Sequence, residues 1–256
     1  MNNEEKLVVL RRMSKLPNWL EKVQFTTTVM IDWKDKCTPI RNQGSCGSCT
    51  AFGVIGVIEA LLKLKYSQEV DLSERDLFAC SGGKCSEGNT VEATLDRAKY
   101  GIATEEECPY MSYDTVCMNF NRSIGAKITD YSYAIGPEAI KLALENGPVV
   151  GTMEVHESFF HYKSGVYHNL GPQDKVVGGH CIVIVGYDDK LGAWLVRNSW
   201  GTGWGMQGYV YIKYGDSEID TQAYIVNVNS PAPMPISNSK CKCLSFLRTL
   251  FRRFCV

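Results

Sequence analysis

Residues 42–64 read NQGSCGSCTAFGVIGVIEALLKL, a turn rich in glycine and cysteine that leads into a long apolar run. The apolar positions cover nearly every side of a helical wheel, which is typical of a buried helix and not of a surface helix. We therefore predict a helix that begins near Ser48 and ends near Leu64. Gly53 and Gly56 carry no side chains, so we expect a neighbouring element to approach this helix closely.

Three further helix signals follow along the chain. The sequence SERD is a capping box and predicts a second helix that starts at Ser73. A third helix is expected between Thr90 and Gly101, because a capping residue precedes the run and a glycine ends it. A fourth is expected from Pro137, a favourable first-turn residue, to Gly147.

After Gly147 the pattern changes to short β-branched and aromatic runs separated by glycine and aspartate. The predicted strands are PVVGTMEV (148–155), CIVIVGY (181–187), AWLVRNS (193–199), GYVYIKY (208–214) and QAYIVNV (222–228). Helices in the first half and strands in the second indicate an α+β fold with a helical lobe and an antiparallel, barrel-like lobe. We place the expected divisions at a leader (1–30), a mainly helical lobe (31–131), a β lobe (132–229) and a Pro/Ser linker with a basic tail (230–256).

The charge of the chain is unevenly distributed. Its formal net charge is −1, but the tail from residue 231 holds five basic residues and no acid. That leaves 22 basic against 28 acidic residues in the rest, a formal charge of −6. A body this acidic argues against nucleic acid binding through a basic face, and no apolar run is long enough for a spanning helix.

Eleven cysteines are present, an odd number, so at least one thiol has no partner within the chain. Their density favours an oxidising compartment, whether vesicular and lysosome-like or extracellular. The N-terminal MNNEEKLVVLRRM, however, has too short an apolar core for a secretory signal. The sequence therefore leaves the compartment open.

Cys49 lies where the glycine-rich turn meets the predicted buried helix. A thiol at a helix N-terminus is near the positive end of the helix dipole, which lowers its pKa and favours the nucleophilic thiolate. The Cys49 N–H also has no partner within the helix and can donate to a developing oxyanion. Gln43, six residues earlier, offers a second donor through its side-chain amide. Taken alone, Cys49 fits equally well as a small apolar core residue.

Two later segments supply groups that a cysteine nucleophile requires. In GGHCIVIVGYD (178–188), His180 opens an apolar strand, and in VRNSWGTGWG (196–205), Asn198 precedes two Trp–Gly pairs. A thiol nucleophile needs a base, and the base needs a group that orients it. These residues are therefore candidates for the partners of Cys49.

QGSCGSC, GGH and NSWGTGWG, in this order, make the chain resemble the papain-like cysteine proteases over residues 31–228. His180 and Asn198 follow Cys49 by 131 and 149 residues, a spacing that belongs to the papain and cathepsin pattern. The resemblance implies the papain-like two-lobe fold, with a helical left lobe, an antiparallel β-barrel right lobe and the active-site cleft between them. It agrees with the separate distribution of helices and strands along the chain.

The resemblance also implies the roles of individual residues. Cys49 is the expected nucleophile and His180 the general base and acid. Asn198 orients the imidazole, and Gln43 completes the oxyanion hole. Trp200 resembles an indole that contacts the site and shields the Asn–His hydrogen bond from water.

Two disulfide bonds are implied in the same way, one between Cys46 and Cys85 and the other between Cys80 and Cys117. Cys181, next to the expected base, has no family partner and is expected to be a buried free thiol.

Substrate-binding positions follow from the resemblance as well. They are Gly47, Gly88, Thr152, Gly178 and Gln222, together with Trp200. Gly88 matches a glycine whose backbone pairs with the substrate, and Glu87 before it predicts an acidic wall. Thr152, Gly178 and Gln222 match the pocket for the second residue before the scissile bond. We expect an apolar preference there, with tolerance for polar or basic side chains, although a Gln222 that points to solvent is equally open.

The predicted function is a cysteine endopeptidase that hydrolyses peptide bonds through a thiol–imidazole pair and an acyl-enzyme, with no metal or organic cofactor. The segment between Cys85 and Cys117 is too short for the occluding loop of cathepsin B, which favours endopeptidase over dipeptidyl carboxypeptidase action. Two alternatives remain open, namely a catalytically silent, protease-like binding protein and a transpeptidase on the same scaffold.

Residues 1–30 resemble a short propeptide, so we expect a zymogen whose leader covers the cleft and is removed. The expected partners are protein or peptide substrates and propeptide-like or cystatin-type inhibitors. The basic tail within 230–256 suits contact with an anionic membrane or acylation of its cysteines, and an unstructured end is equally open.

Overall fold

The computed structural model describes residues 30–117 and 123–229, so the expected leader (1–29) and tail (230–256) lie outside the described residues. The helices are α2 (Cys49–Tyr66), α3 (Glu74–Cys80), α4 (Val91–Ala98) and α5 (Pro137–Leu144), with the short 3₁₀ helices η2 (Lys34–Lys36) and η3 (Glu157–His161). The strands are β1 (Met30–Asp32), β2 (Ile102–Ala103), β3 (Ile124–Ala126), β4 (Ile128–Ile135), β5 (Val149–His156), β6 (Val166–Tyr167), β7 (Val176–Asp188), β8 (Ala193–Arg197), β9 (Tyr209–Lys213) and β10 (Gln222–Val228).

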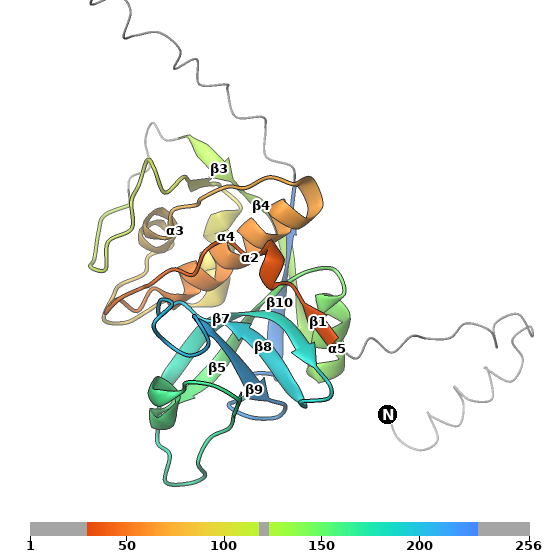
Figure 1. Cartoon of the computed structure of the whole chain (residues 1–256). Helices are drawn as coiled ribbons and strands as arrows, with labels where there is room; N and C mark the ends of the chain where they lie inside the picture. The colour runs from red at the N-terminus through yellow and green to blue at the C-terminus, as the bar shows by residue number, and fades with distance from the viewer. Residues whose placement is uncertain (1–29, 118–122, 230–256) are drawn as a thin grey trace, which may run out of the picture.

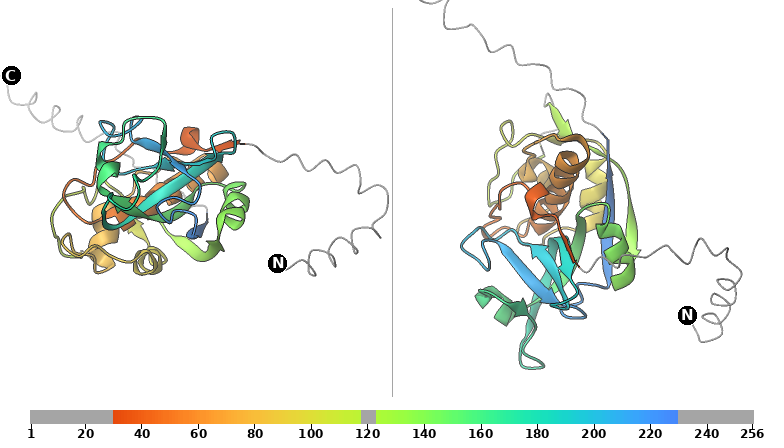
Figure 2. Two further views of the ribbon diagram at one scale, coloured as in Figure 1. Left: turned by 90° about the horizontal axis from the view of Figure 1, so that it is seen from below. Right: turned by 45° about the vertical axis from the view of Figure 1, so that its right-hand side comes forward.

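Most helices and most strands occupy different ends of the molecule, in line with the α+β prediction, although α5 packs into the core of the sheet. Helices α2, α3 and α4 gather at one end, and β5, β7, β8 and β9 lie at the other (Figure 1). Strands β4 and β10 pair side by side and extend from the end that holds most of the strands to the end that holds α2, α3 and α4 (Figure 2). No helix within the described ranges combines the length and apolar content needed to cross a membrane.

Helix α2 is buried along most of its length, which confirms the interpretation of its apolar run. Thirteen of its 18 residues, from Thr50 to Leu62, are buried. The helix ends at Tyr66, two residues beyond the predicted end, where Ser67 adopts a left-handed backbone with φ of 54°. A buried helix this long provides a rigid base for the residue at its first position.

The caps of the other helices form largely as predicted. The Ser73 hydroxyl accepts the Asp76 N–H at 2.9 Å at the start of α3. The reciprocal half of the capping box is missing, because Asp76 accepts the Ala103 N–H and the Ser73 N–H donates to the Ala103 carbonyl. The Thr90 hydroxyl accepts the Ala93 N–H and caps α4.

The main sheet has the strand order β4–β10–β5–β7–β8–β9–β6, with β1 added beside β7. Its neighbours are antiparallel, except that β6 and β9 run parallel. The five strands expected from the sequence are all present, and β7 extends five residues further back than the predicted run.

Strand β7 separates two hydrophobic cores. Cys181, Val183 and Val185 belong to the core that includes α2, whereas Ile182 and Ile184 belong to the core within the sheet. Successive strand residues face opposite sides, so a strand covered on both faces must be apolar at every position. This explains the continuous apolar run after His180 and fixes β7 against α2.

Strands β4 and β1 were not predicted. Strand β4 pairs with β10 from the Ile135–Gln222 pair to the Ile128–Val228 pair, although its residues are mostly exposed and show no regular apolar alternation. It also spans the division expected between residues 131 and 132. Strand β1 has only three residues and joins the sheet through β7. Both strands form because they pair with strands that are distant in the chain. Local sequence patterns do not predict such pairing.

Candidate active site

Cys49 is the first residue of α2, directly after the cap residue Ser48. The Ser48 carbonyl accepts the Ala51 N–H at 3.0 Å and so opens the helix. The N–H groups of Cys49, Thr50 and Cys181 interact with the Cys49 sulfur. The unpaired donors of a helix end, together with one from β7, therefore surround the candidate nucleophile.

Burial nevertheless raises the pKa of the Cys49 thiol above its ordinary value, and the N–H groups of Cys181 and Thr50 oppose this shift. The N–H groups at the helix N-terminus therefore act in the expected direction, but burial outweighs them and the net pKa shift is upward, opposite to the predicted one. Loss of hydration penalises the thiolate more than the nearby N–H groups stabilise it.

His180 and Asn198 lie on neighbouring strands and form a hydrogen bond. His180 is within β7, Asn198 directly follows β8, and the His180 Nε2 to Asn198 Oδ1 distance is 2.8 Å. Because the amide oxygen can only accept, Nε2 donates and the neutral ring carries its lone pair on Nδ1. Burial lowers the pKa of His180 to about 4, which the hydrogen bond with Asn198 opposes. The free site therefore holds a neutral imidazole with an acceptor nitrogen.

Aromatic rings cover this hydrogen bond. The His180 and Trp200 ring centroids are 5.0 Å apart, and the Trp204 ring contacts Trp200 edge-on at 5.2 Å. Phe160 stacks on Trp200 with an interplanar angle of 12°, while its own ring is half exposed. The indole of Trp200 thus contacts both the imidazole and a partly exposed phenyl ring.

Gln43 is buried, and both ends of its amide are held. Its Nε2 donates to the Cys46 carbonyl at 2.9 Å, and its Oε1 accepts the Ser199 hydroxyl at 2.6 Å. Only one of the two Nε2 hydrogens is used in this way, so the second remains to donate. The fixed amide orientation suits a group that must meet a charge forming beside Cys49.

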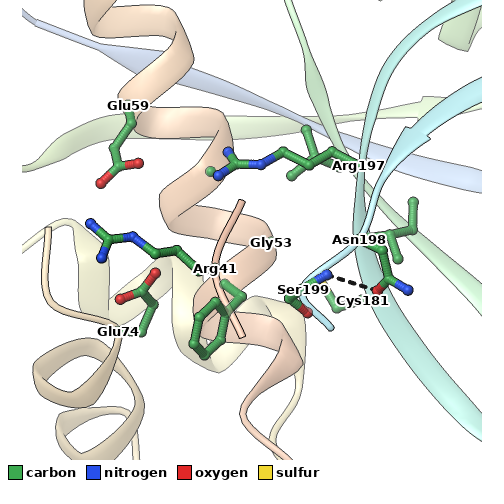
Figure 3. Close-up of a pocket in the computed structure, with 12 residues that line it drawn as sticks. Arg41, Gly53, Glu59, Glu74, Cys181, Arg197, Asn198 and Ser199 are labelled. Carbon is green, nitrogen blue, oxygen red and sulfur yellow. Dashed lines mark hydrogen bonds between the residues drawn. The ribbon is translucent and has the colours of Figure 1, made fainter. Parts of the chain in front are cut away.

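Ser199 connects Gln43 to the base. Its N–H donates to Asn198 Oδ1 at 2.8 Å, the same oxygen that accepts from His180 (Figure 3). Its carbonyl accepts the Gln43 N–H at 2.9 Å. Sequence reasoning missed Ser199, because a serine between Asn198 and Trp200 carries no signal until the fold brings Gln43 against it.

An open pocket of about 880 Å³ lies beside the candidate catalytic residues. Seven of the residues expected at the site line it: Cys49, His180, Gly47, Gly88, Thr152, Gly178 and Gln222. The other three expected residues, Gln43, Asn198 and Trp200, do not line this pocket. They form the hydrogen-bonded and aromatic support behind the nucleophile and base.

Both expected disulfide bonds are present. Cys46 is bonded to Cys85, with Cα atoms 4.3 Å apart, and Cys80 is bonded to Cys117 at 4.5 Å. Cys181 is a buried free thiol, as expected. The first bond holds the turn before Cys49 against the segment around Gly88, where the Gly47 N–H donates to the Cys85 carbonyl. Cys37 and Cys108 are free as well.

A second, enclosed cavity lies behind the site, between α2, α3 and the end of β8 (Figure 3). Its volume of about 10 Å³ admits at most a single water molecule. Glu59, Glu74 and Arg197 line it and are almost fully buried. Burial, with a smaller contribution from Glu59, raises the pKa of Glu74 to about 8. This cavity is too small to hold a peptide, so it is not a candidate substrate site.

Comparison with known proteins matches this geometry to one family. The family described as "Papain family cysteine protease" matches residues 27–227. The chain is 36% identical over 230 residues to digestive cysteine proteinase 1 of Homarus americanus, which covers 82% of this chain and 70% of that protein. It is 35% identical over 232 residues to cathepsin S of Bos taurus, covering 82% and 69% of the two chains. The chain therefore belongs to the papain family of cysteine proteases.

A bromelain protease from Ananas comosus, solved in complex with the E64 inhibitor, has the same fold. It aligns with a TM-score of 0.70 at 26% identity, over 78% of this chain and 99% of the bromelain chain. Fruit bromelain of Ananas comosus is 35% identical over 196 residues, which are 73% of this chain and 55% of that protein. The chain thus spans little more than half the length of one relative and about two thirds of others.

Proposed function

We propose that this protein is a cysteine endopeptidase that cleaves peptide bonds by acyl transfer. The observation that carries the proposal is the His180–Asn198 hydrogen bond beside a pocket that also contains Cys49. The bond fixes the imidazole with its acceptor nitrogen free, which is the state a general base needs.

The proposed reaction starts with proton transfer from the Cys49 thiol to His180 Nδ1, after which the thiolate attacks the peptide carbonyl. The Cys49 N–H and the second Gln43 Nε2 hydrogen donate to the oxyanion. Each such donor contributes about 3 kcal/mol of transition-state stabilisation. Burial makes this transfer unfavourable in the free site, and the attraction between the thiolate and the imidazolium, together with the N–H donors at the sulfur, offsets that cost.

In the second half of the cycle, the His180 imidazolium protonates the leaving amine and the C–N bond breaks, which leaves a thioester on Cys49. Neutral His180 then takes a proton from water, and the resulting hydroxide equivalent attacks the thioester carbonyl. Collapse of the second tetrahedral intermediate returns the proton to sulfur and releases the carboxylic acid.

Labelling with an epoxide that traps active thiols tests this proposal. The wild type should be modified at Cys49 and should cleave peptides under reducing conditions, whereas Cys49→Ala should do neither. Cys181→Ala is the matched control, because it removes a neighbouring thiol that is buried. An intact Cys49 that neither reacts nor cleaves any peptide would identify a silent binding protein instead.

Product analysis distinguishes hydrolysis from transpeptidation, since the two reactions share the acyl-enzyme. Cleavage in the presence of an added amine should still yield mainly the free carboxylic acid. An amide product formed with the added amine would overturn the hydrolase proposal in favour of a transpeptidase.

The zymogen proposal concerns the leader, and the membrane proposal concerns the tail; both segments lie outside the described residues. Loss of the leader from the wild type but not from Cys49→Ala, with no other protease present, would support self-processing. Vesicle binding that survives deletion of residues 231–256 would contradict a membrane role for the tail.

A further inference from the structure

The pocket beside Cys49 and His180 is lined by carboxylates and lacks compensating cations. Its four charged lining residues are Glu87, Glu92, Glu154 and Glu218, and no lysine or arginine lines it within the described parts of the chain. Glu87 pairs with Lys84 at 3.4 Å on the surface. The other three glutamates therefore determine the charge that an incoming side chain meets.

Glu154 faces open space in the pocket. On β5, Met153 and Val155 are buried in the sheet core, so the intervening Glu154 lies on the opposite face. Its cross-strand partner is Gly179, and a Cβ added at Gly179 would meet no atom within 4 Å. The same is true of Gly178. Gly179 thus leaves open space on the face of the sheet that it shares with Glu154, whereas Gly178 is paired with Val155 on the other face.

Glu218 joins this wall from the loop before β10. The Glu154 N–H donates to the Ser217 carbonyl at 2.8 Å, which holds the residue next to Glu218 against β5. Glu218 is exposed at the mouth of the pocket, and Glu154 is half-buried further in. A side chain that enters along this wall therefore meets two carboxylates in succession.

A third carboxylate lies across the pocket, on the helical lobe. The Tyr224 hydroxyl on β10 donates to Glu92 Oε1 on α4 at 2.6 Å. Gln222, the residue expected at the pocket floor, also interacts with the Tyr224 side chain. This end of the pocket is thus polar and anionic, and it suits the charged end of a long side chain better than an apolar group.

We propose that this cleft selects peptides with a lysine or arginine two residues before the scissile bond, and that Glu154 and Glu218 determine the selectivity. This inference rests on the proposed peptidase function and on the expected match of Thr152, Gly178 and Gln222, which line this pocket, to the site for the second residue before the scissile bond. A cationic side chain gains attraction from the carboxylates, and an acidic one is repelled. The Glu92–Tyr224 pair completes the site by presenting a further anionic acceptor to the end of the side chain.

The test uses three fluorogenic peptides that are identical except for arginine, leucine or glutamate at the second residue before the scissile bond. The full chain is assayed under reducing conditions, with rates normalised to the fraction of Cys49 labelled by the epoxide. The arginine peptide should have a kcat/KM about tenfold above the leucine peptide, and the glutamate peptide should be the slowest. Raising the salt concentration should reduce the arginine advantage and leave the leucine rate unchanged.

Glu154→Gln and Glu218→Gln should each lower the arginine-to-leucine ratio about three- to fivefold, the effect of a partly exposed charge pair. Leucine-peptide cleavage should fall less than arginine-peptide cleavage, and epoxide labelling of Cys49 shows that the variants remain folded and active. Glu138→Gln removes an exposed carboxylate from α5, outside the pocket, and is the matched control for net charge.

An unchanged arginine-to-leucine ratio in the Glu154→Gln/Glu218→Gln double variant would overturn the inference, as would equal cleavage of the glutamate and arginine peptides. An equal loss of arginine preference in Glu138→Gln would also overturn it, by assigning the effect to overall charge. Failure of the proposed function gives a different result, because no Cys49 labelling and no cleavage of the leucine peptide would occur.

Discussion

Gly53 of α2 and Cys181 of β7 are in direct contact, and a Cβ added at Gly53 would lie 2.6 Å from the Cys181 sulfur. Gly53 is one helical turn after Cys49, and Cys181 is next to His180. This contact therefore sets the separation between the helix that carries the candidate nucleophile and the strand that carries the candidate base.

Gly53→Ala should push α2 and β7 apart. The intrinsic helix preference of alanine offsets part of the strain, and we expect a net loss of about 1–3 kcal/mol in the free energy of unfolding. The kcat/KM should fall by up to about 100-fold, because small displacements of reacting groups are costly. Denaturant unfolding and peptide kinetics measure both effects.

Gly203→Ala is the control, since an added Cβ there meets no atom within 4 Å. Wild-type stability and rate in Gly53→Ala would contradict this role of the contact.

Ser199→Ala should reduce the rate of the chemical step without preventing folding. The hydroxyl orients the Gln43 amide, while the Ser199 N–H that reaches Asn198 is kept in the variant. We expect kcat to fall about tenfold with little change in KM, which is less than the 100-fold or greater loss expected when an oxyanion donor is removed. Steady-state kinetics of Ser199→Ala and Gln43→Ala, alone and combined, test this order. Additive losses in the double variant would show that the two residues act independently.

Glu74→Gln should remove a pH dependence of stability. The pKa of Glu74 is raised to about 8 in the folded protein from 4.5, so the folded state retains a proton that the unfolded state loses. The associated stability is present below pH 4.5 and is lost as the pH rises to about 8, an effect on the order of 5 kcal/mol. The variant should therefore be more stable than the wild type at pH 8.

Urea unfolding at pH 5 and pH 8 tests this, with the exposed Glu106→Gln as the control. Equal slopes in Glu74→Gln and the wild type would contradict it.

The activity of the enzyme should persist well into the acid range. His180 must be unprotonated to accept the Cys49 proton, and its pKa is lowered to about 4. We expect kcat/KM for the leucine peptide to hold down to about pH 5 and to fall as the pH passes through 4. A pH–rate profile over the range in which the protein stays folded measures this. An acid limb near pH 6.5 would indicate an imidazole that is not desolvated.

The same shift predicts how folding stability depends on pH. The unfolded state binds a proton at His180 near pH 6.5, whereas the folded state does so only near pH 4. Its contribution, on the order of 3 kcal/mol, is complete above pH 6.5 and is lost as the pH falls to 4. Between pH 4.5 and 6.5 this change opposes that of Glu74, so the wild type should show a shallow stability maximum in this range.

Much of the site was predictable because its residues lie in local patterns. The turn before Cys49 and the apolar run after it predict a thiol at the start of a buried helix, and the motifs around Cys49, His180 and Asn198 together carry the resemblance that implies their roles. Ser199 and strand β4 have no such signal, since their roles arise from partners more than 80 residues away in the chain. The Cys49 pKa was predicted with the wrong sign because the helix end is visible in the sequence while the loss of hydration is not.

Hydrophobic patterning and cap residues were enough to predict the buried helix and the separation of helices from strands, and the short motifs around Cys49, His180 and Asn198 carried the resemblance that implies a nucleophile and a base. These features depend on neighbours within a few residues. The acidic pocket, the Ser199 link and the titration of the buried groups were decided only when α2 packed against β7 and the strands paired. Charge, hydration and hydrogen-bond geometry depend on distances through space. Tertiary packing sets those distances, because it brings together residues that are far apart in the sequence.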